Sequence, residues 1–300
     1  MVFDDVYVND LVRAGEVHKK LKAHAKRIIK LGVPLIAIAD EIDSMIEELG
    51  AKPAFPINLS INEVAAHYTP AYNDETLAHG LLKVDIGIQV DGAIADCAFS
   101  VDLDDNPVNK RLIEASRNAL KAAIDTANFG VELRKVGKAI NDEITKMGFT
   151  PITNLCGHQV DRFIVHAGQT VPNYDNHDTE KMLQSGYAIE PFATTGRGAV
   201  YEGGSSNIFR FLEKKPVRDS KAREVLDFII SEYSTLPFAS RWLVKKFGTR
   251  ALVALRFLVN SGSVMEYAQL VEKSKENVSQ SENTIIIFKD GKKIVTTEDY

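Results

Sequence analysis

Two aspartates face each other across a hairpin predicted between residues 82 and 100. Asp91-Gly92 suits a two-residue type I′ turn, because both central positions of that turn need positive φ. With this turn, Asp85 and Asp96 share one face and are diagonal neighbours roughly 7 Å apart at the backbone. Two carboxylates this close repel each other unless a proton or a cation relieves them. The hairpin alone also fits an exposed face with ordinary solvated acids.

Four further side chains have the chemistry of metal ligands. His158 and His166 are eight residues apart, so both project from one face if their segment is extended; otherwise they are unrelated histidines in a polar loop. Glu190 interrupts an apolar strand-like run and Glu282 precedes another, and an acid in such a place needs a partner. Carboxylates with one imidazole match a site for two divalent cations, which lower the pKa of a bridging water. Such a site hydrolyses amides or phosphoesters.

The composition narrows the classes of function. The 300 residues suffice for one large domain or two smaller ones. The net charge of −5 gives no general attraction to nucleic acid or anionic membranes, and no apolar run approaches the ~20 residues that span a bilayer. The chain has two cysteines and no basic-then-apolar leader, which favours a reducing compartment, the cytosol.

Helices and strands together must position these side chains. Apolar residues at helical spacing predict two helices within 9–50, starting near Asn9, and two more within 106–148. A strand region follows each pair, which predicts a duplicated α+β unit, although the residues show no convincing repeat.

Residues from about 211 to 272 mix charged and apolar residues at helical spacing and predict a helical insert. Its basic side chains indicate either a nucleic-acid or partner surface, or a solvated face with the neighbouring aromatics turned inward. The acidic chain has no nucleic-acid motif here, which favours the solvated face. The basic residues are Arg241, Lys245, Lys246, Arg250 and Arg256.

The order of the candidate ligands resembles that of the pita-bread metallopeptidases, and most closely the type II methionine aminopeptidases. The shared order is D-x10-D, GH, E-P-F and E-N-T, and the resemblance covers nearly the whole chain. The 91 residues between Glu190 and Glu282 accommodate the insert that separates type II from type I. The short N-terminus resembles archaeal-type forms. The matching stretches are residues 65–70, 83–99, 154–168 and 188–196.

The resemblance implies an architecture. It implies an α+β fold of the pita-bread (creatinase/aminopeptidase) type, with pseudo-twofold α+β units around a central antiparallel sheet. The whole chain, 1–300, is then a single catalytic domain with a type II helical insert at about 211–272.

The resemblance also implies a role for each ligand. Asp96 and Glu282 bridge two divalent metals, which are Co, Mn, Fe or Zn, and Glu190 is also the proton shuttle for a bridging hydroxide. His67 faces the methionine amine and the scissile amide, while His166 hydrogen-bonds the scissile carbonyl or the tetrahedral oxyanion. The implied metal ligands are Asp85, Asp96, His158, Glu190 and Glu282.

The resemblance also implies an apolar substrate pocket, and two residues near the site need separate comment against the family pattern. Phe55 and Phe192 are implied to line the methionine pocket, and apolar walls suit a thioether. Cys156 lies beside this pocket and either tunes the fit of the substrate or is simply a small buried side chain. Asn283 stands where family members usually carry His, which predicts an altered environment behind the ligands with a modest effect on metal affinity.

The implied activity is that of a cytoplasmic metallo-aminopeptidase, expected to be monomeric. It removes the N-terminal methionine from nascent proteins or peptides when the second residue is small, with transient ribosome contact and no sequence-specific nucleic acid or membrane partner. The alternative is a catalytically silent relative that serves as a binding platform for RNA, the ribosome or a protein. Because all five ligands and both histidines are present, the enzyme is favoured. An Xaa-Pro peptidase is disfavoured by the short N-terminus and the insert.

Overall fold

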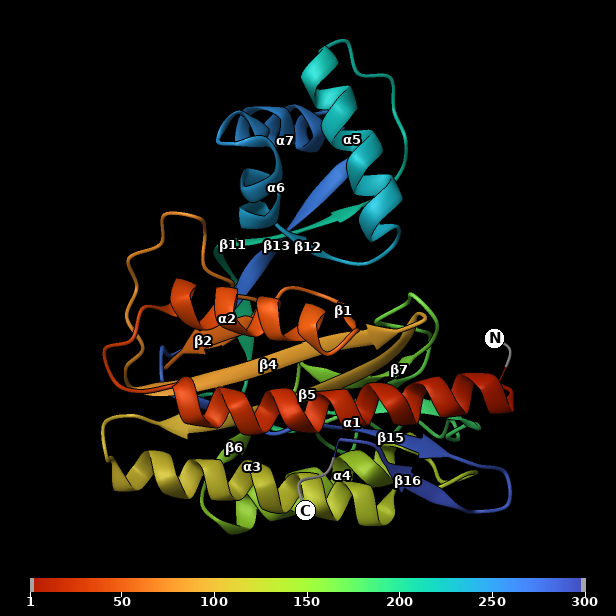
Figure 1. Cartoon of the computed structure of the whole chain (residues 1–300). Helices are drawn as coiled ribbons and strands as arrows, with labels where there is room; N and C mark the ends of the chain where they lie inside the picture. Colours follow the sequence, from red (N-terminus) through yellow and green to blue (C-terminus); the bar gives the residue numbers. More distant parts are fainter. Residues whose placement is uncertain (1–2, 298–300) are drawn as a thin grey trace.

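Two blocks of paired helices and strands are followed by a third, helix-rich segment in the computed structural model, which describes residues 3–297 (Figure 1). The helices are α1 (Asp5–Ile28), α2 (Leu35–Glu48), α3 (Pro107–Thr126), α4 (Leu133–Lys146), α5 (Ser220–Tyr233), α6 (Ser240–Phe247) and α7 (Arg250–Asn260). The strands are β1 (Lys52–Pro53), β2 (Asn58–Ile61), β3 (Val64–Ala66), β4 (Leu81–Val90), β5 (Ala93–Asp102), β6 (Thr150–Pro151), β7 (Cys156–Val160), β8 (Thr170–Pro172), β9 (Ser185–Ile189), β10 (Phe192–Thr194), β11 (Val200–Phe211), β12 (Phe238–Ala239), β13 (Val264–Glu272), β14 (Val278–Gln280), β15 (Asn283–Ile287) and β16 (Lys293–Val295).

The β4–β5 hairpin has the predicted turn and register. Asp91 and Gly92 have φ of 50° and 85°, as a type I′ turn requires. Gly87 pairs with Asp96 across the hairpin, and Asp85 pairs with Ala98. The pairing therefore places the two aspartates on one face as diagonal neighbours.

Each pair of helices covers a different sheet. Helices α1 and α2 share a hydrophobic core with the sheet of β1, β4, β2 and β5. Helices α3 and α4 share a second core with the sheet ordered β16-β15-β9-β7-β8. The predicted duplication of two helices and a sheet is therefore present, and Figure 1 shows α3 and α4 lying below α1. The two sheets meet directly, since the Asp96 amide donates to Thr284 Oγ1 at 2.8 Å and the Glu282 amide to Ala98 O at 2.9 Å.

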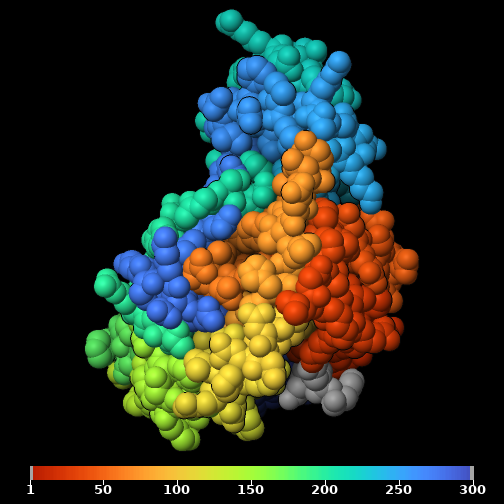
Figure 2. Space-filling view, turned by 90° about the vertical axis from the view of Figure 1, so that its left-hand side faces the viewer, coloured from red at the N-terminus to blue at the C-terminus, as the bar shows by residue number. Residues whose placement is uncertain are grey.

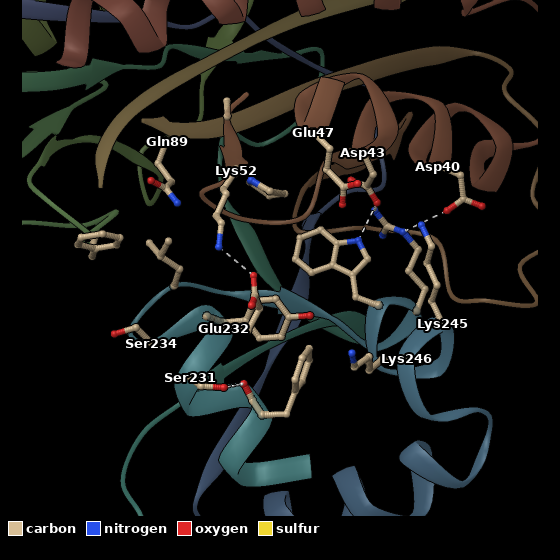
Figure 3. Close-up of a pocket in the computed structure, with 18 of the residues that line it drawn as sticks. Asp40, Asp43, Glu47, Lys52, Gln89, Ser231, Glu232, Ser234, Lys245 and Lys246 are labelled. Carbon is tan, nitrogen blue, oxygen red and sulfur yellow. Dashed lines mark hydrogen bonds and ion pairs between the residues drawn. The ribbon is translucent and has the colours of Figure 1, made fainter. Parts of the chain in front are cut away.

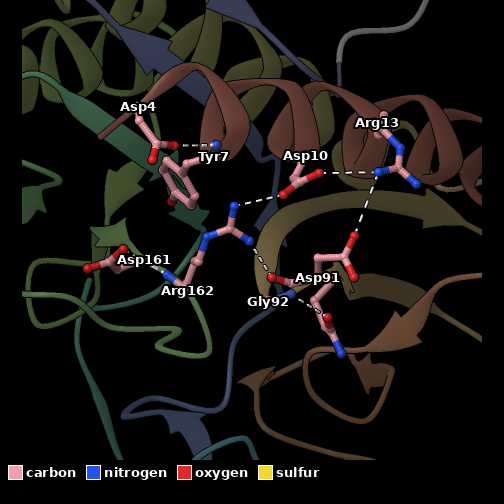
Figure 4. A network of polar contacts seen from close by, with 9 residues as sticks. Asp4, Tyr7, Asp10, Arg13, Asp91, Gly92, Asp161 and Arg162 are labelled. Carbon is pink, nitrogen blue, oxygen red and sulfur yellow. Dashed lines mark hydrogen bonds and ion pairs between the residues drawn. The ribbon is translucent and has the colours of Figure 1, made fainter. Parts of the chain in front are cut away.

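Helix α1 begins earlier than the sequence predicts. The Asp4 carboxylate caps it by accepting the Tyr7 amide at 2.8 Å, whereas Asp10, near the predicted start, is inside the helix. Asp10 instead holds two arginines, 3.2 Å from Arg13 Nη1 and 2.7 Å from Arg162 Nη2 (Figure 4). Arg162 also donates to the Asp91 carbonyl, so these contacts connect α1 to the tip of the hairpin.

The segment between β11 and β13 contains α5, α6 and α7 and has its own hydrophobic core. Figure 1 shows these helices above the rest of the molecule. Strand β13 pairs with β11 on one side and with β3 on the other, and β3 ends directly before His67. Through β13 and β3, the helical segment is therefore connected to the loop that carries His67, a candidate site residue. The description of residues 1–300 as one catalytic domain with this insert stays a prediction.

One of the five basic residues in this segment contradicts the prediction of a solvated face. Arg241 is 4 % exposed, and its Nη2 lies 2.7 Å from Asp43 Oδ2 on α2. The neighbouring Trp242 donates its indole N–H to the same oxygen at 2.6 Å. Arg241 Nη1 also donates to the Thr69 hydroxyl at 2.5 Å. The buried guanidinium of Arg241 thus joins the helical segment to α2 and to the loop after His67. Figure 2 shows this loop beside α7.

A hollow of about 1440 Å³ lies between α2 and helices α5 and α6. Lys52 crosses it to reach Glu232, with Nζ and Oε1 3.1 Å apart (Figure 3). None of the five predicted metal ligands lines it, so this hollow is separate from the predicted chemistry. Among residues 3–297, no helix combines the length and the apolar character needed to cross a bilayer.

Candidate metal centre

The candidate ligands converge from five places in the chain. His158 Nε2 on β7 lies 3.6 Å from Asp96 Oδ2 on β5 and 3.6 Å from Glu190 Oε1, which follows β9. One ligand atom each from Asp96, His158 and Glu282 lies within 4.8 Å of the others. Asp85 interacts with Asp96 on the shared face of the hairpin.

Strand pairing explains this convergence. His158 pairs with Ala188 in the β7–β9 ladder, so Glu190, two residues on from Ala188, is brought to the same end of the sheet. Asn283 pairs with Ile189 in the β15–β9 ladder, which places Glu282 beside Glu190. Glu190 and Glu282 are therefore neighbours, although they are 92 positions apart in the sequence, because they flank adjacent ends of β9 and β15.

Burial gives this cluster a large electrostatic cost. Asp96, His158 and Glu282 are 3 %, 4 % and 1 % exposed. Burial raises the pKa of Asp85 to about 7, and burial together with the neighbouring carboxylates raises the pKa of Asp96, Glu190 and Glu282 well above the ordinary range. Within residues 3–297, none of the four carboxylates forms an ion pair with Lys or Arg. Gln280 Nε2 lies 3.4 Å from oxygens of Glu190 and Glu282, too far to offset much of this repulsion.

The cluster fits divalent cations. Asp85, Asp96 and Glu282 each keep one buried carboxylate oxygen without a hydrogen-bond partner. Such unpaired acceptors are costly unless a ligand uses them. Burial lowers the pKa of His158 to about 3, so its imidazole is neutral and able to ligate a metal. Oxygen-rich sites with an imidazole are typical of divalent first-row metals.

Two histidines stand next to the cluster. The ring centroids of His166 and His158 are 4.4 Å apart at an interplanar angle of 65°. His67 has φ of 60°, a conformation that few residues other than glycine adopt. Its ring contacts Tyr267 on β13, with centroids 5.4 Å apart. Burial, with a smaller contribution from His166, lowers the pKa of His67 to about 4, so its imidazole is neutral at pH 7.

The aromatic residues predicted to line the substrate pocket are both buried. Phe55 is 8 % exposed and packs over the backbone of Gly87 in the hairpin: a Cβ built at Gly87 would lie 2.0 Å from Phe55 Cε1. Phe192 is 2 % exposed and belongs to a separate apolar cluster that includes Ala66, next to His67. The structure thus places Phe55 against the ligand-bearing strands and Phe192 near the loop of His67.

The two departures from the family pattern have different surroundings. Cys156 is exposed, so the interpretation as a simple buried side chain is wrong. Loss of water around its thiol, together with the charge of Glu190, raises the Cys156 pKa to about 11, and the thiol stays protonated. Asn283 is 9 % exposed, and its side-chain amide lies 2.9 Å from the hydroxyl of Thr297. Asn283 is therefore held behind the cluster by the C-terminal segment.

Three residues near the site did not follow from the sequence. Gln280 precedes Glu282 by two positions, and the period of two along a strand is a signal that could have found it. Tyr267 and Arg210 come from β13 and β11, whose pairing has register shifts, and no sequence pattern indicates that they approach the histidines.

Two buried and two partly buried carboxylates with one histidine, at the meeting of two α+β units, define a metallohydrolase of the pita-bread type. The fold is also that of a solved structure of a thermophilic Arx1, with a TM-score of 0.83 at 14% identity over 98% of this chain and 91% of that one. The methionine aminopeptidase of Thermotoga maritima has a TM-score of 0.72 at 18% identity, over 100% and 99% of the two chains. The predicted α+β pita-bread fold is thereby confirmed.

The chain belongs to metallopeptidase family M24, whose model matches residues 9–211. The methionine aminopeptidase of Pyrococcus abyssi is 48% identical over 296 residues, which cover 97% of this chain and 99% of that relative. The predicted class, a peptidase that binds divalent metal, is confirmed, and the silent binding platform is not favoured. Glu282 lies beyond the part matched by the family model, but within the fold shared with full-length relatives.

Proposed function

We propose that this metallo-aminopeptidase removes the N-terminal methionine from peptides and nascent proteins whose second residue is small. The observation that carries the proposal is the cluster of four carboxylates around His158, in a chain nearly half identical to a methionine aminopeptidase. Two divalent ions, Co, Mn, Fe or Zn, would be held there. The ligands would be Asp85, Asp96, His158, Glu190 and Glu282.

The side chains around the cluster supply the remaining chemistry. Bound divalent ions would lower the pKa of a water and polarise the scissile carbonyl. Glu190, whose pKa is raised, can hold the proton taken from the attacking water at a carboxylate oxygen and pass it to the leaving amine. The neutral imidazoles of His67 and His166 can donate hydrogen bonds to the peptide amide and its developing oxyanion. The apolar rings of Phe55 and Phe192 suit a thioether side chain.

The test is methionine release by the purified protein loaded with Mn²⁺ or Co²⁺. We expect cleavage of Met-Ala-Ser and at least ~100-fold slower cleavage of Met-Leu-Ser, because a narrow site rejects the larger second side chain. Exhaustive chelation should remove the activity, and metal analysis should give two ions per chain. Equal cleavage by the chelated protein contradicts the metal mechanism, and tight RNA binding without peptidase activity in any metal supports the binding platform instead.

A substitution at Gly87 tests the place of the methionine side chain. Because the backbone φ of Gly87 is not in the left-handed region, alanine is strained there only by its contact with Phe55. We expect Gly87→Ala to displace the Phe55 ring and raise KM for methionyl peptides about tenfold, with a smaller change in kcat. Gly204→Ala, where a Cβ meets nothing closer than 3.7 Å, is the matched control. An unchanged KM in a folded, fully metallated Gly87→Ala protein excludes Phe55 from the methionine pocket.

The substrate proposal implies a location and a state of assembly. Methionine removal from nascent chains places the protein in the cytoplasm, with transient contact to the ribosome, and two cysteines without a disulfide suit a reducing compartment. We propose a monomer. Sedimentation of the metallated protein tests this, and a mass twice that of the chain contradicts it.

A further inference from the structure

Arg210 places a cation near the two histidines of the site, and no acidic residue among those that the structure describes pairs with it. Its guanidinium carbon lies 6.0 Å from the centre of the Tyr267 ring. The centre of the His67 ring lies 5.4 Å from the centre of the same tyrosine ring. Arg210 pairs with Met265 across the β11–β13 ladder, and Tyr267, two residues on from Met265, shares that face. The arginine therefore lies on the same face of these strands as Tyr267, whose ring contacts His67.

The contacts of Arg210 leave its donors largely unused. Its Nη2 approaches only the Met265 sulfur, at 3.6 Å, and its Nε is buried without a hydrogen-bond partner. Within residues 3–297 it forms no ion pair with a carboxylate. The acid nearest along β13, Glu266, is bound to the Ser205 hydroxyl on the other face. A guanidinium has five N–H donors in a fork that matches a carboxylate, so an unpaired one beside a peptide site indicates an anionic ligand.

The charge of Arg210 is felt on both sides of the site. Burial lowers the pKa of His166 and the charge of Arg210 lowers it further, while the same charge opposes the increase that burial causes in the pKa of Tyr267. His166 in turn contacts His158 at 4.4 Å between ring centroids. Arg210 thus belongs to the same electrostatic neighbourhood as the residues that would hold the scissile amide, although it touches none of the metal ligands.

The substrate part that Arg210 would meet follows by elimination, if the proposed function holds. The metal cluster would take the free amine, and Phe55 and Phe192 the methionine side chain. His67 and His166 would hold the scissile amide. The guanidinium then remains for the peptide beyond the scissile bond.

We propose that Arg210 is a specificity residue that binds a carboxylate of the peptide on the leaving-group side. This inference rests on the proposed aminopeptidase function and adds a charge preference to it. The carboxylate is either the free C-terminus of a short peptide or the side chain of an acidic third residue. A small second side chain leaves both within the reach of the long arginine, and the two sources are separated by the choice of peptides.

Two pairs of peptides test the proposal on the metallated enzyme. Met-Ala-Gly with a free C-terminus is compared with its C-terminal amide, and amidated Met-Ala-Glu-Ser with amidated Met-Ala-Gln-Ser. We expect the carboxylate member of at least one pair to have about tenfold higher kcat/KM, as a charge-assisted hydrogen bond supplies. This preference should decrease with added salt, because part of it is Coulombic. The pair that shows it identifies the source of the carboxylate.

Variants at position 210 assign the preference to this residue. In Arg210→Gln the ratio of kcat/KM within the preferred pair should fall to about one, with kcat/KM on the uncharged member kept within about threefold. Arg210→Lys should restore part of the ratio, because it keeps the charge but loses the fork. Arg210→Met keeps an unbranched side chain against Tyr267, and serves if the glutamine variant does not fold. Arg250→Gln, an exposed arginine at the start of α7, should leave the ratio unchanged.

The outcomes separate this proposal from the proposed function. If the wild-type enzyme shows a ratio near one in both pairs, or keeps its preference in both Arg210→Gln and Arg210→Met, the role of Arg210 is wrong while methionine removal stands. If no methionyl peptide is cleaved with any metal, the proposed function itself fails.

Discussion

Glu190→Gln is expected to lose at least ~1000-fold in kcat, and its metal-free form is expected to be more stable than the metal-free wild type. The loss of activity follows because an amide neither shuttles a proton nor holds a cation as a carboxylate does. The gain in stability follows because Glu190 is buried among like charges that raise its pKa. Removing this ionisable group relieves repulsion that otherwise only a proton or a cation offsets. We expect an increase in Tm of about 3–6 °C for the metal-free variant.

The two effects are measured separately and need different controls. Metal-free proteins are compared by thermal unfolding at pH 7.5, and metal-loaded proteins by methionine release and metal analysis. Glu48→Gln, an exposed glutamate on α2, is the matched control and should change neither quantity. His67→Ala should lose turnover comparably while keeping the metal content of the wild type, because His67 contacts Tyr267 rather than the cluster. A metal-free Glu190→Gln protein that unfolds below the wild type contradicts the repulsion argument.

The hairpin and the position of its two aspartates could be predicted because local rules decide them. The type I′ turn at Asp91-Gly92 fixes the register of β4 and β5, and that register alone puts Asp85 and Asp96 on one face. His158, Glu190 and Glu282 were candidates by residue type and strand-like context, and the resemblance assigned them to the same site. Residue patterns do not encode the long-range strand pairing that brings them together. The structure brings all five together, and it does so through the ladders from β9 to β7 and to β15.

The surroundings of the cluster could not be predicted, for physical reasons that differ between residues. In the sequence, Arg241 cannot be distinguished from an exposed basic residue. Only the packing of α6 against α2 shows that it is buried and paired with Asp43. Arg210 and Tyr267 approach the histidines through the long-range pairing of β11 with β13, which no local pattern specifies. The start of α1 was missed because Asp4 and Asn9-Asp10 are equivalent as capping residues by type. The buried pair of Asp10 with Arg162 decides between them.

The metal-free protein is expected to lose stability as the pH rises from 6.5 to 8.5. A buried carboxyl whose pKa is raised binds more protons in the folded than in the unfolded state, so its stabilising contribution is complete below pH 4 and is lost as the pH rises through the folded pKa. Burial raises the pKa of Asp85 to about 7, and the pKa values of Asp96, Glu190 and Glu282 are also raised. Over this window Asp85 alone should account for a loss of about 1 kcal/mol, or a decrease in Tm of about 2 °C, and the other three raised groups act in the same direction.

The choice of window excludes the histidines and the acids whose pKa values are lowered. His67 and His158 have lowered pKa values of about 4 and 3, so they contribute the opposite slope, but only below about pH 6.5, where the unfolded chain protonates them. Asp74 and Glu272, whose pKa values are lowered, change stability only in more acidic solution. Burial lowers the pKa of Lys83 well below its ordinary range, which gives the opposite slope in alkaline solution. The contribution of the carboxyl groups is therefore taken from the difference between the wild type and Asp85→Asn.

Metal should reverse this dependence, and the reversal makes the test specific. Cations bind deprotonated ligands, so the stability that they add increases with pH. Thermal unfolding of metal-free and metal-loaded protein from pH 6.5 to 8.5 should give slopes of opposite sign, and Asp85→Asn should flatten the metal-free slope. A metal-free Tm that stays constant or rises over this range means that the four carboxylates are not held together without a cation. The geometry of the cluster would then require the metal in order to form.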